Sequence, residues 1–287
     1  MREINVKPNS IILEPCGRNT GPAITIAALK ALEIYEDPNI LVLASDHQIE
    51  DEIIFLDVIQ NGLEYSSKGK LVTFGIVPTS PEIGYGYIKS KIPLSKTVQA
   101  SSVDCFIEKP DKDKAMKLIK DNRFTWNSGI FLFKARNILK ELEYFEPDML
   151  KYCKLSLQKS LFDLDFQRLE IKSFAKCPDI SIDIAVMEKT KNAYVLSLDA
   201  GWSDVGSWDS IWSMSKKNSE GNVIQGNIIA EDTKNSFLLS QKRLITAIGL
   251  ENIIVVETND AILIAKKDES QKVKDMVKFL KDNNKTI

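Results

Sequence analysis

The sequence predicts a layered α/β fold with a mostly parallel sheet, followed by a small β-rich unit. Helix and strand patterns alternate through the first two-thirds of the 287 residues, which is typical of such folds. Several strand candidates are short, continuous apolar runs, the kind that is buried on both faces of a parallel sheet. Near Lys216 the pattern changes to short strands separated by turn residues. We therefore predict two domains, residues 1–216 and residues 217–287, joined by a polar linker.

The elements of the first domain are predicted from apolar periodicity and from capping residues. The first helix has Thr20 or Asn19 as its cap and Pro22 in its first turn. Helices are expected at residues 24–35, 53–66, 112–121 and 137–144. Strands are expected at residues 40–45, 71–76, 86–90, 103–108 and 129–133.

The second domain is expected to be almost entirely strand. Its predicted strands are residues 223–229, 236–240, 244–248, 252–257 and 261–266. A basic amphipathic helix at about residues 269–280 closes the chain. Its low aromatic content favours a packed terminal helix with a solvated lysine face over a membrane-binding helix.

Bulk composition excludes several classes of function. The net charge of −2 provides no basic field for a nucleic-acid partner. No apolar run approaches the roughly 18 residues of a membrane helix, and the N-terminus has no apolar signal region. His47 is the one histidine, so a multi-histidine zinc site is impossible. No two of the four cysteines have the spacing of a metal knuckle or a redox pair, so we expect reduced thiols in a cytoplasmic protein.

The segment from Glu14 to Pro22 places glycines and capping residues before a helix N-terminus. Such a helix entry suits an anionic or nucleotide ligand, and Arg18 adds a planar fork of donors. The alternative is an ordinary capped helix.

Two aspartates are candidate ligands of a divalent cation. Asp46 directly follows a buried strand, and ligands of open α/β sheets bind at the carboxyl ends of strands. Asp204 lies between glycines and two tryptophans. Carboxylates suit Mg²⁺, a hard cation that prefers oxygen. The alternatives are a helix cap for Asp46 and an aromatic-rich turn for Asp204.

Two further motifs place polar residues beside strands. Lys109 follows Glu108 and can act as a point charge on a phosphate, although the two also suit a surface ion pair of little energetic weight. Asn127 precedes a buried strand, where its amide can bond sugar hydroxyls or serve as a turn residue. The segments 84–88 and 181–184 are weaker candidates.

These motifs together resemble one family. EPCGRNTGPAI, LASDH, GYGYI, FIEKP, WNSGIFLF, SIDIAVME and WSDVGSW occur in the order found in mannose-1-phosphate guanylyltransferases, within the sugar-1-phosphate nucleotidyltransferases. The similarity spans residues 14–208, and the β-rich tail looks like that family's C-terminal region. It implies a Rossmann-like three-layer sandwich that forms GDP-mannose and pyrophosphate from GTP and mannose 1-phosphate.

The resemblance also implies roles for individual residues. Positions on the nucleotide side are Glu14, Arg18, Asn19, Thr20 and Asp46. Positions that hold Mg²⁺, or another divalent cation, are Asp46 and Asp204. Positions that line the sugar are Gly86, Glu108, Asn127 and Asp183. Lys109 matches the lysine that meets the sugar phosphate, and with Asp46 and Asp204 it forms the implied catalytic set. The attacking phosphate oxygen is already an anion, so no strong general base is needed.

The sequence departs from the family at its start. The family's first strand, its GG-x-GTRLWPLSR loop and its PKQF-like segment have no counterpart here. We therefore expect a domain that is N-terminally truncated, with an open sheet edge beside the strand ending at Asp46 and with impaired activity. Four explanations are compatible with this departure. The chain is a fragment, half of a split enzyme completed by an N-terminal fragment, a remnant with a rearranged sheet, or a homodimer formed through the open edge. The alternative function is a non-catalytic nucleotide-sugar-binding subunit; a purely structural role for the motifs is a third reading.

Overall fold

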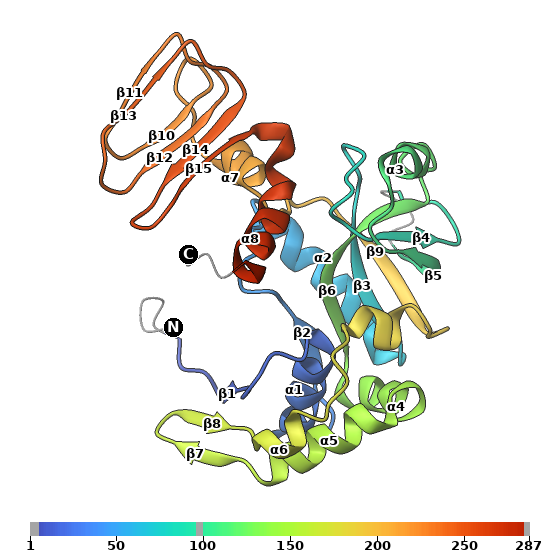
Figure 1. The fold of residues 1–287 in the computed structure, drawn as a ribbon. Helices are drawn as coiled ribbons and strands as arrows, with labels where there is room; N and C mark the ends of the chain where they lie inside the picture. Colours follow the sequence, from blue (N-terminus) through green and yellow to red (C-terminus); the bar gives the residue numbers. More distant parts are fainter. Residues whose placement is uncertain (1–5, 96–99, 284–287) are drawn as a thin grey trace. The chain divides into compact units, whose positions relative to one another are not determined.

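The computed structural model describes residues 6–95 and 100–283, and these form two compact units. The first unit comprises Met1–Ser45 and Ile49–Trp202. The second comprises Asp46–Gln48 and Ser203–Ile287. Figure 1 shows the helices and strands of both units.

A six-stranded sheet forms the centre of the first unit (Figure 1). Its strands, in spatial order, are β2 (Asn39–Val42), β6 (Phe124–Lys134), β3 (Leu71–Ile76), β9 (Ala193–Leu198), β5 (Ala100–Ile107) and β4 (Tyr87–Ser90). β4 also pairs with β6. β2 lies at the edge of the sheet, which agrees with the open edge that the sequence predicts beside Asp46.

The predicted α/β class is confirmed, but the expectation of a mostly parallel sheet is wrong. Among the described strands of this six-stranded sheet, only β3 and β9 pair in parallel, whereas β6 runs antiparallel to β2, β3 and β4. β5 likewise runs antiparallel to β4 and β9. A continuous apolar run reports burial on both faces of a sheet and carries no information on strand direction, so the sequence could not reveal this mixture.

Helices cover both faces of this sheet and make three layers. On one face lie α1 (Thr20–Ile34), α4 (Ala135–Phe145) and α5 (Pro147–Gln158); on the other lie α2 (Glu52–Ser67) and α3 (Lys112–Leu118). Alternation along β6 separates the two cores, because Phe131 and Phe133 pack in the first and Ile130 and Leu132 in the second.

Several elements of the first unit have no counterpart in the predictions. β1 (Ile11–Leu13), β8 (Phe166–Arg168) and β7 (Leu161–Asp163) form a separate three-stranded sheet in that order. A short helix α6 (Ile171–Phe174) and a helical turn η1 (Asp183–Met187) follow. We call the chain between them, residues 175–182, the linking segment.

The second unit winds three strands into a parallel stack. Its main sheet has the order β10 (Val223–Gln225), β12 (Phe237–Ser240), β14 (Ile253–Glu257) and β15 (Ile262–Lys266), and β15 alone pairs antiparallel. A second, parallel pair consists of β11 (Ile228–Glu231) and β13 (Ile245–Ile248). Asn222 ties one corner of the coil together, because its amide accepts a hydrogen bond from Ser236 N and donates one to Thr233 O.

Helices flank this stack. α7 (Trp208–Met214) packs through Trp208 on Phe237 of β12, with ring centroids 5.4 Å apart. Residues 203–216 therefore group with the β-rich unit, whereas the sequence places them in the first domain. The predicted terminal helix corresponds to a turn η2 (Lys267–Lys272) and helix α8 (Val273–Asp282). No helix in the described part of the chain is long and apolar enough to cross a membrane.

Candidate active site

Four of the predicted residues meet in the first unit, and we call them the Asn127 cluster: Gly86, Glu108, Asn127 and Asp183. They come from the loop before β4, the end of β5, the middle of β6 and the start of η1. Asn127 N donates to Gly86 O at 2.8 Å, and its Nδ2 donates to Asp183 Oδ1 at 2.6 Å. A Cβ added to Gly86 would lie 2.8 Å from Glu108 Oε2, so any larger residue at this position would make that carboxylate shift.

An irregularity in β6 directs the Asn127 side chain. The register between β3 and β6 shifts between Thr73 and Gly75, opposite this part of β6. Ser128 Oγ donates to Phe74 O at 2.6 Å, and Asn127 Oδ1 accepts from Gly129 N. Bulges of this kind re-aim side chains beside functional sites.

The two carboxylates of the Asn127 cluster lie in different electrostatic environments. Burial raises the pKa of Asp183, the hydrogen bond from Asn127 opposes that shift, and the charge of Glu108 adds to it. Glu108 itself is exposed. An amide and two carboxylates in this arrangement offer one donor group and several acceptors, which suits a ligand with several hydroxyl groups.

Lys109 lies at the rim of the cluster. Its Nζ is 3.4 Å from Glu108 Oε1, and both side chains are more than half exposed. The Lys109 backbone has a φ of 37°, which is uncommon for a residue with a side chain. An exposed pair of this kind adds little stability, so the ammonium group is available to a ligand anion.

The Arg18–Thr20 turn is held by the linking segment. Arg18 Nη2 donates to Ala175 O at 2.6 Å, and Ile182 N donates to Thr20 Oγ1 at 3.0 Å. Gly21 N donates to Ile180 O at 3.1 Å, and a Cβ there would lie 2.6 Å from that oxygen. The predicted nucleotide-side residues Arg18 and Thr20 therefore brace the linking segment.

Asn19, between these two residues, has an unusual backbone. It has φ 62° and ψ −171°, a region open in practice only to glycine. Its Oδ1 accepts from Thr20 N, so it serves as the N-cap of α1, as one of the two sequence alternatives has it. Strain of this kind clusters at functional sites.

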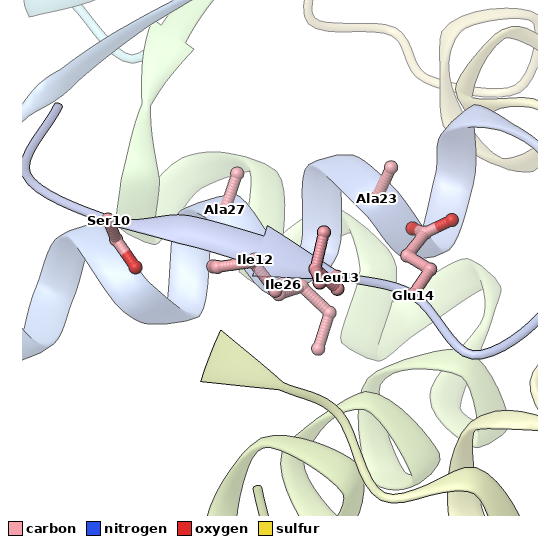
Figure 2. A pocket seen from close by; sticks show the side chains of 7 residues that line it. All are labelled: Ser10, Ile12, Leu13, Glu14, Ala23, Ile26 and Ala27. Carbon is pink, nitrogen blue, oxygen red and sulfur yellow. The ribbon is translucent and has the colours of Figure 1, made fainter. Parts of the chain in front are cut away.

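Glu14 lies at a pocket of about 510 Å³ that runs along β1 and α1 (Figure 2). The lining is mainly apolar and includes Ile12, Leu13 and Ile26. Burial raises the pKa of Glu14. None of the other predicted site residues lines this pocket, but the charges of Glu14 and Arg18 both act on the Cys177 thiol, where Glu14 raises its pKa and Arg18 lowers it.

The two candidate metal ligands belong to the second unit. Gln48 and Ser203 pair antiparallel, with N to O distances of 2.8 and 3.0 Å, so Asp46 and Asp204 flank one short bridge. Asp46 is exposed and Asp204 is half-buried. Asp204 Oδ1 accepts from Gly206 N at 3.0 Å, and a Cβ on Gly206 would collide with that carboxylate.

Asp46 and Asp204 carry the type of oxygen donor that a magnesium ion prefers. The described residues contain no group of three acidic, histidine or cysteine side chains that could enclose a metal. Mg²⁺ in proteins is commonly held by one or two carboxylates, with substrate phosphates and water completing its shell. The hard oxygen donors of Asp46 and Asp204 meet that requirement.

Sequence reasoning missed the linking segment and the Gln48–Ser203 bridge. Both act through backbone groups: Ala175 O and Ile180 O accept from the Arg18–Thr20 turn and Gly21. Side-chain motifs carry no record of such contacts. A proline at position 178 was the signal that could have marked the linking segment as irregular chain.

Comparison with known proteins finds a family model for most of the chain and a second for its β-rich part. A family model described as nucleotidyl transferase matches residues 2–221. A second, described as MannoseP isomerase/GMP-like beta-helix domain, matches residues 226–280. The second match agrees with the parallel stack of β10, β12 and β14.

Individual relatives cover nearly the whole chain. The mannose-1-phosphate guanylyltransferase of Salmonella muenchen is 47% identical over 99% of this chain, and that of Klebsiella pneumoniae is 44% identical over 100%. The chain spans only 60–61% of the length of these curated relatives. A solved structure described as mannose-1-phosphate geranyltransferase from Thermus thermophilus is 28% identical, with a TM-score of 0.80, and the match covers 94% of this chain and 77% of the other.

Proposed function

The chain belongs to the nucleotidyl transferase family, and on that premise we propose that it forms GDP-mannose and pyrophosphate from GTP and mannose 1-phosphate. The guanylyltransferase names of its relatives support this choice of substrates. We also propose a cytoplasmic location, because no two of the four cysteines have the sequence spacing of a metal knuckle or a redox pair.

The observation that carries the proposal is the Asn127 cluster. Four chain segments converge to place an amide, two carboxylates and a glycine backbone at one point, with the Asn127 Nδ2–Asp183 Oδ1 distance at 2.6 Å. In the proposal Asn127 and Asp183 orient the mannose hydroxyls, and Glu108 accepts a further one. Because Asn127 and Asp183 already hold each other, little conformational entropy is lost when the sugar binds.

The proposed reaction is an in-line displacement at phosphorus. The phosphate oxygen of mannose 1-phosphate attacks the α-phosphorus of GTP, and the bond to pyrophosphate breaks. Lys109 neutralises the sugar phosphate and holds it for attack. Asp46 and Asp204 would hold Mg²⁺, which when bound offsets the negative charge of the triphosphate. No general base is required, so positioning and charge neutralisation supply the rate enhancement.

The direct test is turnover by the purified chain with GTP, mannose 1-phosphate and MgCl₂. GDP-mannose is quantified by anion-exchange chromatography and pyrophosphate by a coupled assay, and a reaction without MgCl₂ is the matched control. We expect slow, magnesium-dependent formation of both products in equal amounts, in line with the impaired activity that the sequence predicts. Calorimetric binding of GDP-mannose without turnover favours the non-catalytic nucleotide-sugar-binding subunit. Neither turnover nor binding overturns the proposal.

A further inference from the structure

Two buried cysteines lie in contact in the first unit. Cys153, on α5, and Cys177, in the linking segment, have their Sγ atoms 3.7 Å apart. Cys153 is fully buried and Cys177 is 4% exposed. The two are 24 positions apart in sequence, so the sequence gives no sign that they form a pair.

The surroundings make the two thiols chemically different. The hydrogen bond from Cys153 lowers the pKa of Cys177, and the charge of Arg18 acts in the same direction. The same hydrogen bond, together with burial, raises the pKa of Cys153. A thiolate is the nucleophile in thiol oxidation, so Cys177 is the reactive member and Cys153 the partner.

The two sulfur atoms belong to parts of unequal rigidity. Cys153 lies within α5 among core residues such as Met149 and Leu157. Cys177 lies in the linking segment, which has no regular structure from residue 178 to 181. A disulfide bond is about 2 Å long, so bond formation must bring the sulfurs together. The linking segment, rather than α5, is the part that can move.

We propose that Cys153 and Cys177 form a reversible redox site whose oxidation to a disulfide by a peroxide shifts the linking segment. The Cys177 thiolate attacks one peroxide oxygen, forming an S–O bond and breaking the O–O bond; the leaving hydroxide takes a proton and becomes water. The Cys153 sulfur then attacks the sulfenic sulfur, the S–S bond forms, and the hydroxide that leaves takes the proton of Cys153. Two thiols are thus oxidised, and one hydrogen peroxide is reduced to two water molecules.

The linking segment connects this site to the candidate active site. Ala175 O and Ile180 O hold Arg18 and Gly21, and Ile182 N holds Thr20. Its next residue is Asp183, which bonds Asn127. A displacement of Cys177 would therefore strain the hydrogen bonds that the linking segment makes with the Arg18–Thr20 turn, and the hydrogen bond between Asp183 and Asn127.

The experiment compares the reduced full chain with the chain treated with hydrogen peroxide. Free thiols are blocked with N-ethylmaleimide, and tryptic peptides are mapped by mass spectrometry without reduction. The linked product joins residues 152–154 to residues 177–189, since trypsin cleaves after Lys151, Lys154, Lys176 and Lys189. Hydrogen exchange of peptides that contain the Gly21 and Ile182 amides is measured on both forms.

We expect the linked peptide pair in the oxidised chain, its disappearance with dithiothreitol, and several-fold faster exchange of the Gly21 and Ile182 amides. Cys105→Ala and Cys16→Ala should leave the product unchanged, whereas Cys153→Ala should abolish it. Complete alkylation of both cysteines after peroxide treatment, or oxidation of the exposed Cys105 alone, overturns the proposal. A disulfide with unchanged exchange overturns the link to the active site. If Cys153→Ala does not fold, the map of the unsubstituted chain decides alone.

Discussion

The Asn127 cluster and the Asp46/Asp204 pair differ in burial and in the hydrogen bonds that hold their side chains. Asn127 and Asp183 hold each other at 2.6 Å in a largely buried setting, and burial raises the pKa of Asp183. Asp46 is exposed, and a single backbone bridge between Gln48 and Ser203 sets its position opposite Asp204. The Asn127 cluster is organised by contacts between its own side chains, whereas the Asp46/Asp204 pair is organised by a backbone bridge and by the hydrogen bond from Gly206 N to Asp204 Oδ1.

The difference teaches where each kind of substitution will act. In the Asn127 cluster, removal of one partner leaves a buried group unsatisfied, so stability and sugar binding should fall together. At the Asp46/Asp204 pair, two like charges flank one short bridge, and a bound cation would offset both. Loss of a carboxylate there should reduce activity and spare the fold.

The largest effect is expected for Asp204→Asn. The loss of a cation ligand should lower kcat by at least about 100-fold, because charge neutralisation at phosphates contributes several kcal/mol to such reactions. The unfolding midpoint in urea should stay unchanged. Asp275→Asn, on an exposed face of α8, is the matched control and should retain full activity. Unchanged kcat at saturating MgCl₂ would remove Asp204 from the catalytic set.

Asn127→Ala should affect stability and binding together. It removes the hydrogen bond that Asn127 Nδ2 donates to the largely buried Asp183 carboxylate, and the free energy of unfolding should fall by about 1–3 kcal/mol. The KM for mannose 1-phosphate should rise in the same variant. The exposed Asn61–Asp57 hydrogen bond provides the control, so Asn61→Ala should stay within about 0.5 kcal/mol. Equal effects of the two substitutions would show that the Asn127 cluster has no special organisation.

Two glycines near one turn test the support of the Arg18–Thr20 turn. Gly21→Ala must displace Ile180 O, since its Cβ would lie 2.6 Å from that backbone atom. Overpacking outweighs the helix-propensity gain of alanine, so the free energy of unfolding should fall by about 1–2 kcal/mol. Gly17→Ala meets nothing within 4 Å and should be nearly neutral. Urea denaturation measures both, and equal stability of the two variants contradicts close packing against the linking segment.

The smallest effect concerns pH. Asp183 has a pKa raised above its ordinary 3.8, so its contribution to stability is present below pH 3.8 and is lost as pH rises through the raised value. Asp121 is the opposite case, because hydrogen bonds from Arg123 lower its pKa to about 2. Its contribution is present above pH 3.8 and is lost as pH falls toward 2.

Urea unfolding of Asp183→Asn and Asp121→Asn across this range measures the two contributions. Relative to the unsubstituted chain, the stability differences should change with opposite slopes. Slopes of the same sign would mean that burial does not dominate at Asp183.

Local sequence patterns predicted most of the elements but not how they are joined. The strand at residues 71–76 agrees with β3, and the helices at residues 24–35 and 53–66 agree with α1 and α2 within a few residues. Apolar periodicity and capping residues act over one or two turns, so the sequence alone is sufficient to predict these elements. The direction of β6 and the existence of α5 depend on tertiary packing and were missed.

The candidate site shows the same division. The motif residues of the Asn127 cluster were named from the sequence, and the structure brings them together; their role in sugar binding stays a prediction. The Cys153–Cys177 contact was missed because it joins distant segments, and because cysteine spacing was judged only by short motifs. The hydrogen bonds accepted by the backbone carbonyls of the linking segment could not be predicted, because every residue type carries the same carbonyl group.

Asn19 has a consequence for natural selection. Its backbone lies in a region where glycine alone is comfortable, so nearly any other residue keeps some strain there. A random search for more stable variants would favour glycine at this position. With asparagine at this position, the chain has a side chain that caps α1 and accepts the strain that glycine would relieve, so stability against unfolding and the cap cannot both be maximal here.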